Sequence, residues 1–134
     1  MRKLCTLTLT GLLSASPWAL AANWVEFAQS ADENATYFLD TSSVKVNGKK
    51  RSAWSKSVLV TSQAYNGGLL QSLVALVEVD CDGRTQRTRS EVGFSPDGKT
   101  LYQYGENPTP TPVIPDSIGE GRLEAICTHK LKKK

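Results

Sequence analysis

The sequence predicts a small, mainly β domain of the α+β class: an antiparallel meander of about six strands, with one C-terminal helix tethered to it by a disulfide. Three observations predict this fold. Short runs of β-branched and aromatic residues alternate with turn signals from Asn23 to about Tyr104. A capping-box pattern near the C-terminus begins an apolar helical face. Two cysteines remain once an N-terminal signal has been removed.

Residues 1–21 have the composition of a secretory signal peptide. Arg2 and Lys3 precede a short apolar stretch, and Ala19 and Ala21 supply the small residues of a signal-peptidase site. The apolar stretch is shorter than the roughly 20 residues that a membrane-spanning helix needs. A buried N-terminal helix is the alternative interpretation. We expect cleavage before Ala22 and export to the periplasm, the outer surface or the medium.

Residues 22–134 have the length of one domain. Loss of Arg2 and Lys3 with the signal lowers the basic residues from 16 to 14 against 13 acidic residues, for a net charge of about +1. Nucleic-acid-binding domains usually carry a strong basic excess. We therefore expect neither a nucleic-acid partner nor, for want of a long apolar run, a membrane span.

The cysteines indicate one structural bridge. Cys5 leaves with the signal, so Cys81 and Cys127 remain, and an even number in an oxidising compartment favours a disulfide. Cys5 lies at the start of the apolar stretch, which is not where a lipoprotein signal places its cysteine. Closing the loop between Cys81 and Cys127 removes unfolded-chain entropy worth about 4 kcal/mol.

The strands are expected where apolar and β-branched residues gather between turns. Turn signals stand at Asn47-Gly48, Asp82-Gly83 and Pro96-Asp97-Gly98, where glycine accepts a positive φ. The predicted strands are Trp24–Ala28, Ala35–Asp40, Val44–Val46, Ser52–Thr61, Leu69–Asp80, Thr85–Phe94 and Leu101–Tyr104.

Alternation along two of these strands predicts which sheet face is buried. Ala75, Val77 and Val79 share the parity of Cys81, so this row should face the core. In the next strand we expect Val92 and Phe94 on the face of Thr88 and Ser90, with Arg87, Arg89 and Glu91 on the other. One face of the sheet should therefore be exposed to solvent.

After Gly105 a proline-rich stretch, residues 107–115, predicts an extended spacer with few backbone donors. Ser117 and Glu120 then form a capping box that begins a short helix. The helix should present one apolar face, and the bridge would hold that face on the sheet. Its members are Leu123, Ile126, Cys127 and Leu131.

Motifs for catalysis, metal binding or cofactor binding are missing from the sequence. His129 is the only histidine, and a place near the helix C-terminus accounts for it. Asp80 and Asp82 flank Cys81 at a strand end that leads into a turn. Serine-nucleophile, P-loop and dinucleotide patterns do not occur. We expect a protein without enzymatic activity, metal or cofactor.

Two basic clusters are candidate partner-binding sites. One could form a stripe along a strand, although alternation with Glu91 also fits an ordinary solvated face. The other is the C-terminal tail. Tyr102 and Tyr104 share one parity in the strand before the proline-rich stretch, and they could either cover this stretch or face a partner. The candidate binding residues are Arg84, Arg87, Arg89, Lys132, Lys133 and Lys134.

The order of several landmarks resembles the surface-adhesin protein E family of Gram-negative bacteria. The landmarks are Trp24, Tyr37-Phe38-Leu39-Asp40 with Ser43-Val44, Gly48, Trp54, Glu78-Val79-Asp80-Cys81, the basic stretch Arg84 to Arg89, Ile114-Pro115-Asp116-Ser117 and Cys127. The resemblance implies a concave antiparallel sheet with a disulfide-tethered C-terminal helix, and a homodimer as one assembly. It also implies protein ligands such as laminin, vitronectin and plasminogen.

The leading functional hypothesis is an exported binding module that recognises another macromolecule without chemistry of its own. The alternative is a periplasmic structural or inhibitory protein, for example one that blocks a cell-wall hydrolase. Within the first hypothesis, Lys134 presents an ammonium group beside the terminal carboxylate. The lysine-binding kringles of plasminogen recognise that paired charge, while a solvated helix end is the simpler interpretation of the tail.

Overall fold

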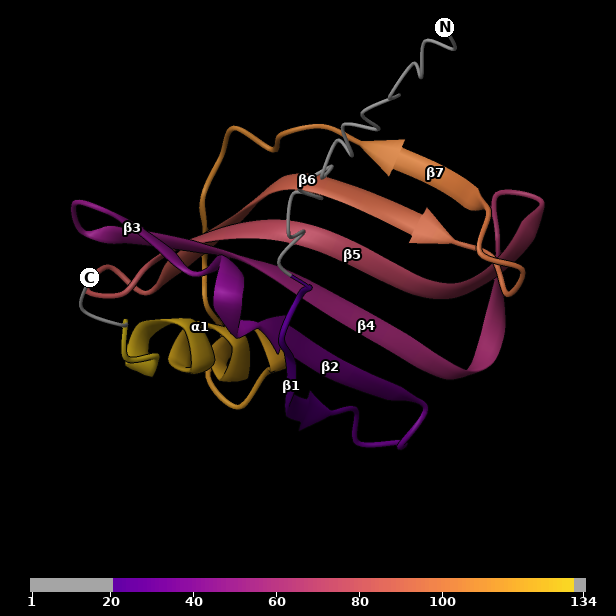
Figure 1. Cartoon of the computed structure of the whole chain (residues 1–134), viewed down its shortest axis with the longest axis horizontal. Helices are drawn as coiled ribbons and strands as arrows, with labels where there is room; N and C mark the ends of the chain where they lie inside the picture. Colours follow the sequence, from indigo (N-terminus) through magenta and orange to yellow (C-terminus); the bar gives the residue numbers. More distant parts are fainter. Residues whose placement is uncertain (1–20, 132–134) are drawn as a thin grey trace, which may run out of the picture.

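A single antiparallel sheet makes up most of the computed structural model, which describes residues 21–131 (Figure 1). The main strands are hydrogen-bonded in the order β1-β2-β4-β5-β6-β7. Two short strands lie off this path: β3 pairs with the start of β4, and β8 pairs with β6. The predicted meander is therefore confirmed. The strands are β1 (Trp24–Gln29), β2 (Ala35–Asp40), β3 (Lys45–Asn47), β4 (Lys50–Tyr65), β5 (Gly68–Asp80), β6 (Thr85–Phe94), β7 (Thr100–Tyr104) and β8 (Thr111–Pro112).

The hairpin turns form where small and polar residues allow a left-handed backbone. Gly48 has a φ of +61° between β3 and β4, as the Asn47-Gly48 signal predicts. Between β5 and β6 the left-handed residue is Arg84, with a φ of 49°, rather than Gly83. The N–H of Gly83 instead donates to Asp80 Oδ1 at 2.7 Å. An aspartate side chain thus organises that turn.

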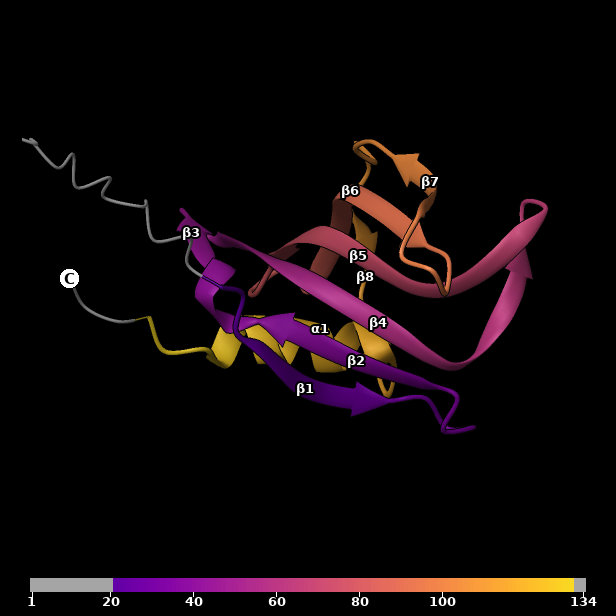
Figure 2. The same cartoon turned by 45° about the vertical axis from the view of Figure 1, so that its right-hand side comes forward.

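The longest hairpin extends beyond its predicted end. We expected a strand to stop at Thr61, but β4 continues to Tyr65 and turns at Asn66 and Gly67, whose φ angles are 47° and 76°. This Asn-Gly pair is the same signal as that at Asn47-Gly48. As a result β4 and β5 are much longer than the other strands, and they bend near their shared turn (Figure 2).

A bulge in β6 changes the predicted faces of this strand. Leu76 lies opposite Ser90, but Val77 lies opposite Thr88, so Arg89 is inserted between them. An inserted residue reverses the parity of everything beyond it. Glu91 therefore shares the face of Ala75, not that of Arg87, and the predicted grouping of Arg87, Arg89 and Glu91 on one face is wrong.

The C-terminal helix α1 (Ile118–Thr128) begins with the predicted cap. Ser117 Oγ accepts from the N–H of Glu120 at 3.2 Å, and Glu120 Oε2 accepts from the N–H of Asp116 at 2.8 Å. His129 is the C-cap, so Leu131 lies past the helix and is 45% exposed. The expectation that Leu131 belongs to the apolar helical face is wrong.

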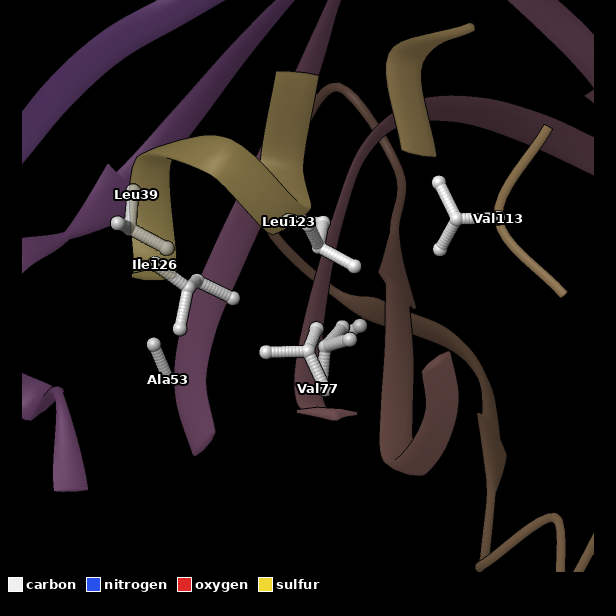
Figure 3. Packing of buried hydrophobic residues seen from close by; sticks show 8 residues of the cluster. Leu39, Ala53, Val77, Val113, Leu123 and Ile126 are labelled. Carbon is white, nitrogen blue, oxygen red and sulfur yellow. The ribbon is translucent and has the colours of Figure 1, made fainter. Parts of the chain in front are cut away.

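The core lies between α1 and one face of the sheet. Ile126 and Leu123 of the helix contact side chains of β2, β4 and β5, and Val113 closes one end (Figure 3). The predicted bridge is present: Cys81 and Cys127 form a disulfide with their Cα atoms 5.9 Å apart. Arg51 reaches from β4 to the helix end, where its Nη1 donates to the carbonyls of Ile126 and His129 at 3.1 and 3.0 Å.

The proline-rich stretch lies against the sheet instead of bridging open space. The N–H of Asn107 donates to Thr88 O at 2.8 Å, and that of Val113 donates to Arg84 O at 2.9 Å. Residues 107–113 thus follow the edge of β6 as far as β8. No helix within residues 21–131 is long and apolar enough to cross a membrane.

We call the sheet surface under α1 the helix face and the opposite surface the outer face. Alternation places Ala53 and its cross-strand partner Val77 on the helix face, and Trp54 with its partner Leu76 on the outer face. Ala53 and Val77 are buried, while Trp54 and Leu76 remain partly exposed.

Candidate partner-binding surface on the outer face

An ion network crosses one end of the outer face. Glu78 Oε1 accepts from Arg87 Nε at 2.8 Å, and Glu78 Oε2 accepts from Arg89 Nη1 at 3.0 Å. Glu106 joins the same two arginines at 3.1 and 3.0 Å, and Lys50 lies 3.6 Å from Glu78. Register explains the arrangement, because Glu78 and Arg87 are direct partners across the β5–β6 hairpin.

The network keeps Glu78 ionised. Burial alone raises the pKa of Glu78, but the hydrogen bond and charge of Arg87, with Lys50 and Arg89, outweigh burial and hold this pKa below its usual range. Three cations face two carboxylates, so the network retains an excess of one positive charge.

The structure separates the predicted basic stripe into two places. Arg87 and Arg89 share the network on the outer face, with side chains that are 19% and 37% exposed. Arg84 lies in the preceding turn and pairs instead with Glu120 at the helix N-terminus. Glu78 and Glu106 were not among the predicted site residues. Counting outward from the Asp82-Gly83 turn would have placed Glu78 beside the arginines.

A hollow of about 320 Å³ opens beside this network. Lys45 and Lys50 line it from the β3–β4 hairpin, Arg89 lines it from β6, and Leu76 contributes an apolar wall. Glu78 is the acidic member among these side chains. The hollow therefore presents a mainly cationic rim over an apolar patch, a combination suited to an acidic protein surface.

Aromatic residues form the neighbouring part of the outer face. Lys56 Nζ lies 4.5 Å from the ring centre of Trp24 and 5.3 Å from that of Phe38, which is cation–π geometry. Trp54 and Leu76 lie next along the strands, and all four apolar side chains are partly exposed. Tryptophan and arginine are the residue types that dominate binding energy in protein interfaces.

Tyr102 and Tyr104 lie on the helix face, opposite Gly93 and Glu91 of β6. Their rings are 5.0 Å apart, and Tyr65 stacks on Tyr102 at 4.8 Å. Tyr102 donates to Glu91 Oε1 at 3.0 Å. Burial and then the bond to Glu91 raise the pKa of Tyr102 well above its ordinary value. Tyr65 shares a hydrogen bond with Tyr104, whose side chain is 49% exposed.

Lys132, Lys133 and Lys134 lie outside the described residues, so the tail hypothesis stays a prediction. Within residues 21–131, no cluster of three or more His, Cys, Asp or Glu side chains is placed to hold a metal ion. What the described chain displays is a sheet with one covered face and one face carrying rings and paired charges. These features define a small antiparallel β domain with an exposed sheet face of aromatic and charged side chains.

Comparison with known proteins identifies the family. The sequence profile described as Surface-adhesin protein E matches residues 24–128, so the chain belongs to this family. The resemblance drawn from the sequence is thereby confirmed, and membership supports an adhesin-like binding role. No curated protein matches the chain.

Three solved structures of Haemophilus influenzae protein E share the fold. One is 12% identical, covers 85% of this chain and 90% of its own, and has a TM-score of 0.56. A second crystal form is 13% identical with coverages of 85% and 94% and a TM-score of 0.58. A selenomethionine form is 10% identical with coverages of 85% and 92% and a TM-score of 0.52. At these identities the likeness establishes the fold alone.

Proposed function

We propose that this chain is an exported, non-enzymatic binding protein of the adhesin type, which holds a protein partner on its outer face. The observation that carries the proposal is the juxtaposition of a partly exposed aromatic cluster with a cationic hollow on a sheet face that α1 does not cover. Aromatic anchors bordered by charged groups are typical of the centres and rims of protein interfaces. The predicted residues Arg87 and Arg89 belong to this surface.

Candidate partners are matrix and serum proteins, namely laminin, vitronectin and plasminogen, which the family resemblance suggests. The test is binding of the exported protein to each immobilised ligand, for the parent chain and for Trp54→Ala. Removal of a central aromatic anchor should raise Kd at least tenfold, which corresponds to about 1.4 kcal/mol of binding free energy. The matched control is Tyr104→Ala, which removes a half-exposed ring from the helix face and should bind like the parent.

A folded Trp54→Ala variant that binds all three ligands as tightly as the parent would contradict the outer-face proposal. Lys56→Gln supplies a second, milder change on the same surface and guards against a variant that fails to fold. Chromatography with light scattering, run alongside, reports whether the protein forms the homodimer that the resemblance implies.

The basic tail makes a separate contribution in this proposal. A chain that ends at Lys134 should bind plasminogen more tightly than one that ends at Leu131, and a free lysine analogue should compete only with the longer form. Equal binding of both forms would contradict a role for the tail in binding plasminogen and would favour the interpretation of a solvated helix end. Long-range attraction by the lysines also weakens with salt, since the screening length is about 8 Å at physiological ionic strength.

Surface display is part of the adhesin proposal. Protease added to intact cells should degrade the protein if it faces outward. Complete protection on intact cells, with degradation after the outer membrane is opened, would favour the alternative of a periplasmic structural or inhibitory role.

A further inference from the structure

A second polar site lies on the helix face, away from the surface proposed above. It is a hollow of about 80 Å³ beside α1, with Arg122 of the helix on one side and Glu91 of β6 on another. Ser55 and Ser57 of β4 also line it, and both residues are buried. One enclosed water needs about 10–15 Å³. The Arg122 hollow therefore has room for a few waters or for one small polar group.

The guanidinium of Arg122 lacks a partner for its charge. Its Nε is buried and has no hydrogen-bond partner within residues 21–131. None of the ion pairs in this part of the chain includes Arg122. Burial lowers the pKa of Arg122, although the nearby Tyr37 and Glu91 oppose the shift. Arginine nevertheless stays protonated in proteins, so the guanidinium keeps its charge while its buried Nε–H lacks an acceptor, which is unfavourable.

Glu91 does not supply that anion. No ion pair within residues 21–131 joins it to Arg122, and its Oε1 accepts the hydroxyl of Tyr102 at 3.0 Å. The hollow thus has a cation and a carboxylate on its walls that do not touch each other. A ligand with a carboxylate alone would satisfy Arg122 and be repelled by Glu91. A ligand with a carboxylate and a neighbouring N–H donor would satisfy both.

We propose that the Arg122 hollow binds an amino-acid-like group, in which a carboxylate and an N–H donor are carried on the same carbon. The carboxylate meets Arg122, with the hydroxyls of Ser55 and Ser57 as further donors, and the N–H meets Glu91. The group can come from a free small amino acid or from the C-terminal residue of a polypeptide, which share this chemistry. The site is independent of the outer face, so it can fail or succeed without the proposed function.

The test follows the side-chain Nε–H signals of ¹⁵N-labelled arginine in the exported protein by NMR. Glycine represents the free amino acid, N-acetylglycine represents a chain end, and propionate is a carboxylate without the donor. We expect a saturable shift of the Arg122 signal with glycine or N-acetylglycine, and binding at least tenfold weaker with propionate. Arg122→Gln assigns the signal and should abolish the shift of neighbouring amides. The matched control Arg89→Gln, on the outer face, should leave the titration unchanged.

Each outcome decides the proposal. Saturation with glycine alone identifies a free amino acid, and saturation with N-acetylglycine identifies a chain end. Absence of saturation with both means that the hollow holds only water, and overturns the proposal. Equal affinity for propionate overturns the role of Glu91, which a Glu91→Gln variant checks independently because it should remove the preference for glycine over propionate. Arg122→Gln should remain folded, since it removes a partly buried charge whose Nε has no hydrogen-bond partner within residues 21–131.

Discussion

The two faces of the sheet use the same strands in different ways. On the helix face, small apolar residues such as Ala53 and Val77 are covered by Ile126 and are held by the Cys81–Cys127 bridge. On the outer face, Trp54 and Glu78 occupy the alternate positions and meet other rings and charges instead of a second layer. The comparison indicates that the helix face holds the apolar core and the disulfide, while the outer face holds partly exposed rings and paired charges.

Removal of the disulfide that holds α1 on the helix face should have the largest effect on stability. Cys127→Ser should lower the free energy of unfolding by about 2–5 kcal/mol, because the unfolded chain regains the entropy of the closed loop. Denaturant unfolding of the parent and the variant measures this difference. Cys81→Ser is the matched control and should lose the same amount. A parent protein that shows two reactive thiols in its native state would contradict the bridge.

Glu78→Gln tests whether the outer face also contributes to stability. The change removes the more buried of the two carboxylates that Arg87 and Arg89 share, a side chain that is 12% exposed, and leaves them with Glu106 alone. We therefore expect a loss of about 2 kcal/mol at neutral pH. If Glu78→Gln lowers the free energy of unfolding by less than about 1 kcal/mol, as expected for an exposed ion pair, the network does not contribute to stability.

The carboxyl group of Glu78 should also make the free energy of unfolding depend on pH. The folded pKa of Glu78 lies below its ordinary value of 4.5, so its contribution is present above pH 4.5 and is lost as the pH falls through the folded pKa. Unfolding at pH 7 and at pH 3 should therefore show a smaller acid destabilisation in Glu78→Gln than in the parent. Equal acid sensitivity of the two proteins would assign the effect to other carboxylates.

Arg51→Gln weakens the helix face by a different route. Arg51 donates to two carbonyls at the C-terminal end of α1 and places its charge where the helix dipole favours a cation. Loss of both should cost about 1–2 kcal/mol. Hydrogen exchange should locate the effect in the last turn of α1, and uniform acceleration throughout the sheet would argue against a local cap.

Arg84→Gln should have the smallest effect. Arg84 pairs with Glu120 near the surface, where its side chain is 47% exposed, so the expected loss is below about 1 kcal/mol. The same denaturant measurement tests it, with Lys99→Gln as a control at another exposed pair. A loss as large as that of Glu78→Gln would mean that the helix N-terminus depends on this pair.

Local patterns carried most of the fold prediction. The alternation of Ala75, Val77 and Val79 identified the buried row, and Ser117 with Glu120 identified the helix start, because each signal lies within a few neighbouring residues. The bulge at Arg89 has no comparable signal, since Thr88, Arg89 and Ser90 are all polar and one inserted residue leaves the pattern unchanged. The faces beyond that point could not be assigned from sequence alone.

The candidate sites depend on cross-strand register, which explains why they were predicted only in part. Arg87 and Arg89 were identified as cations, but their acidic partners come from another strand and from the segment after β7. The Arg122 hollow requires a helix residue, β4 and β6 to meet, and Arg122 alone resembles an ordinary polar position on a helix. The arginines could be identified from the sequence, whereas the side chains that pair with them could not.

The bridge between Cys81 and Cys127 also determines how the molecule responds to proteolysis. It closes a covalent ring that contains β6, β7, β8 and α1. A protease that cuts inside this ring, for example at the exposed turn around Asp97, leaves one connected molecule whose two ends both remain joined to the sheet. Such a cut protein would migrate as a single species until it is reduced. In an environment rich in proteases, the ring keeps a damaged loop from releasing the helix.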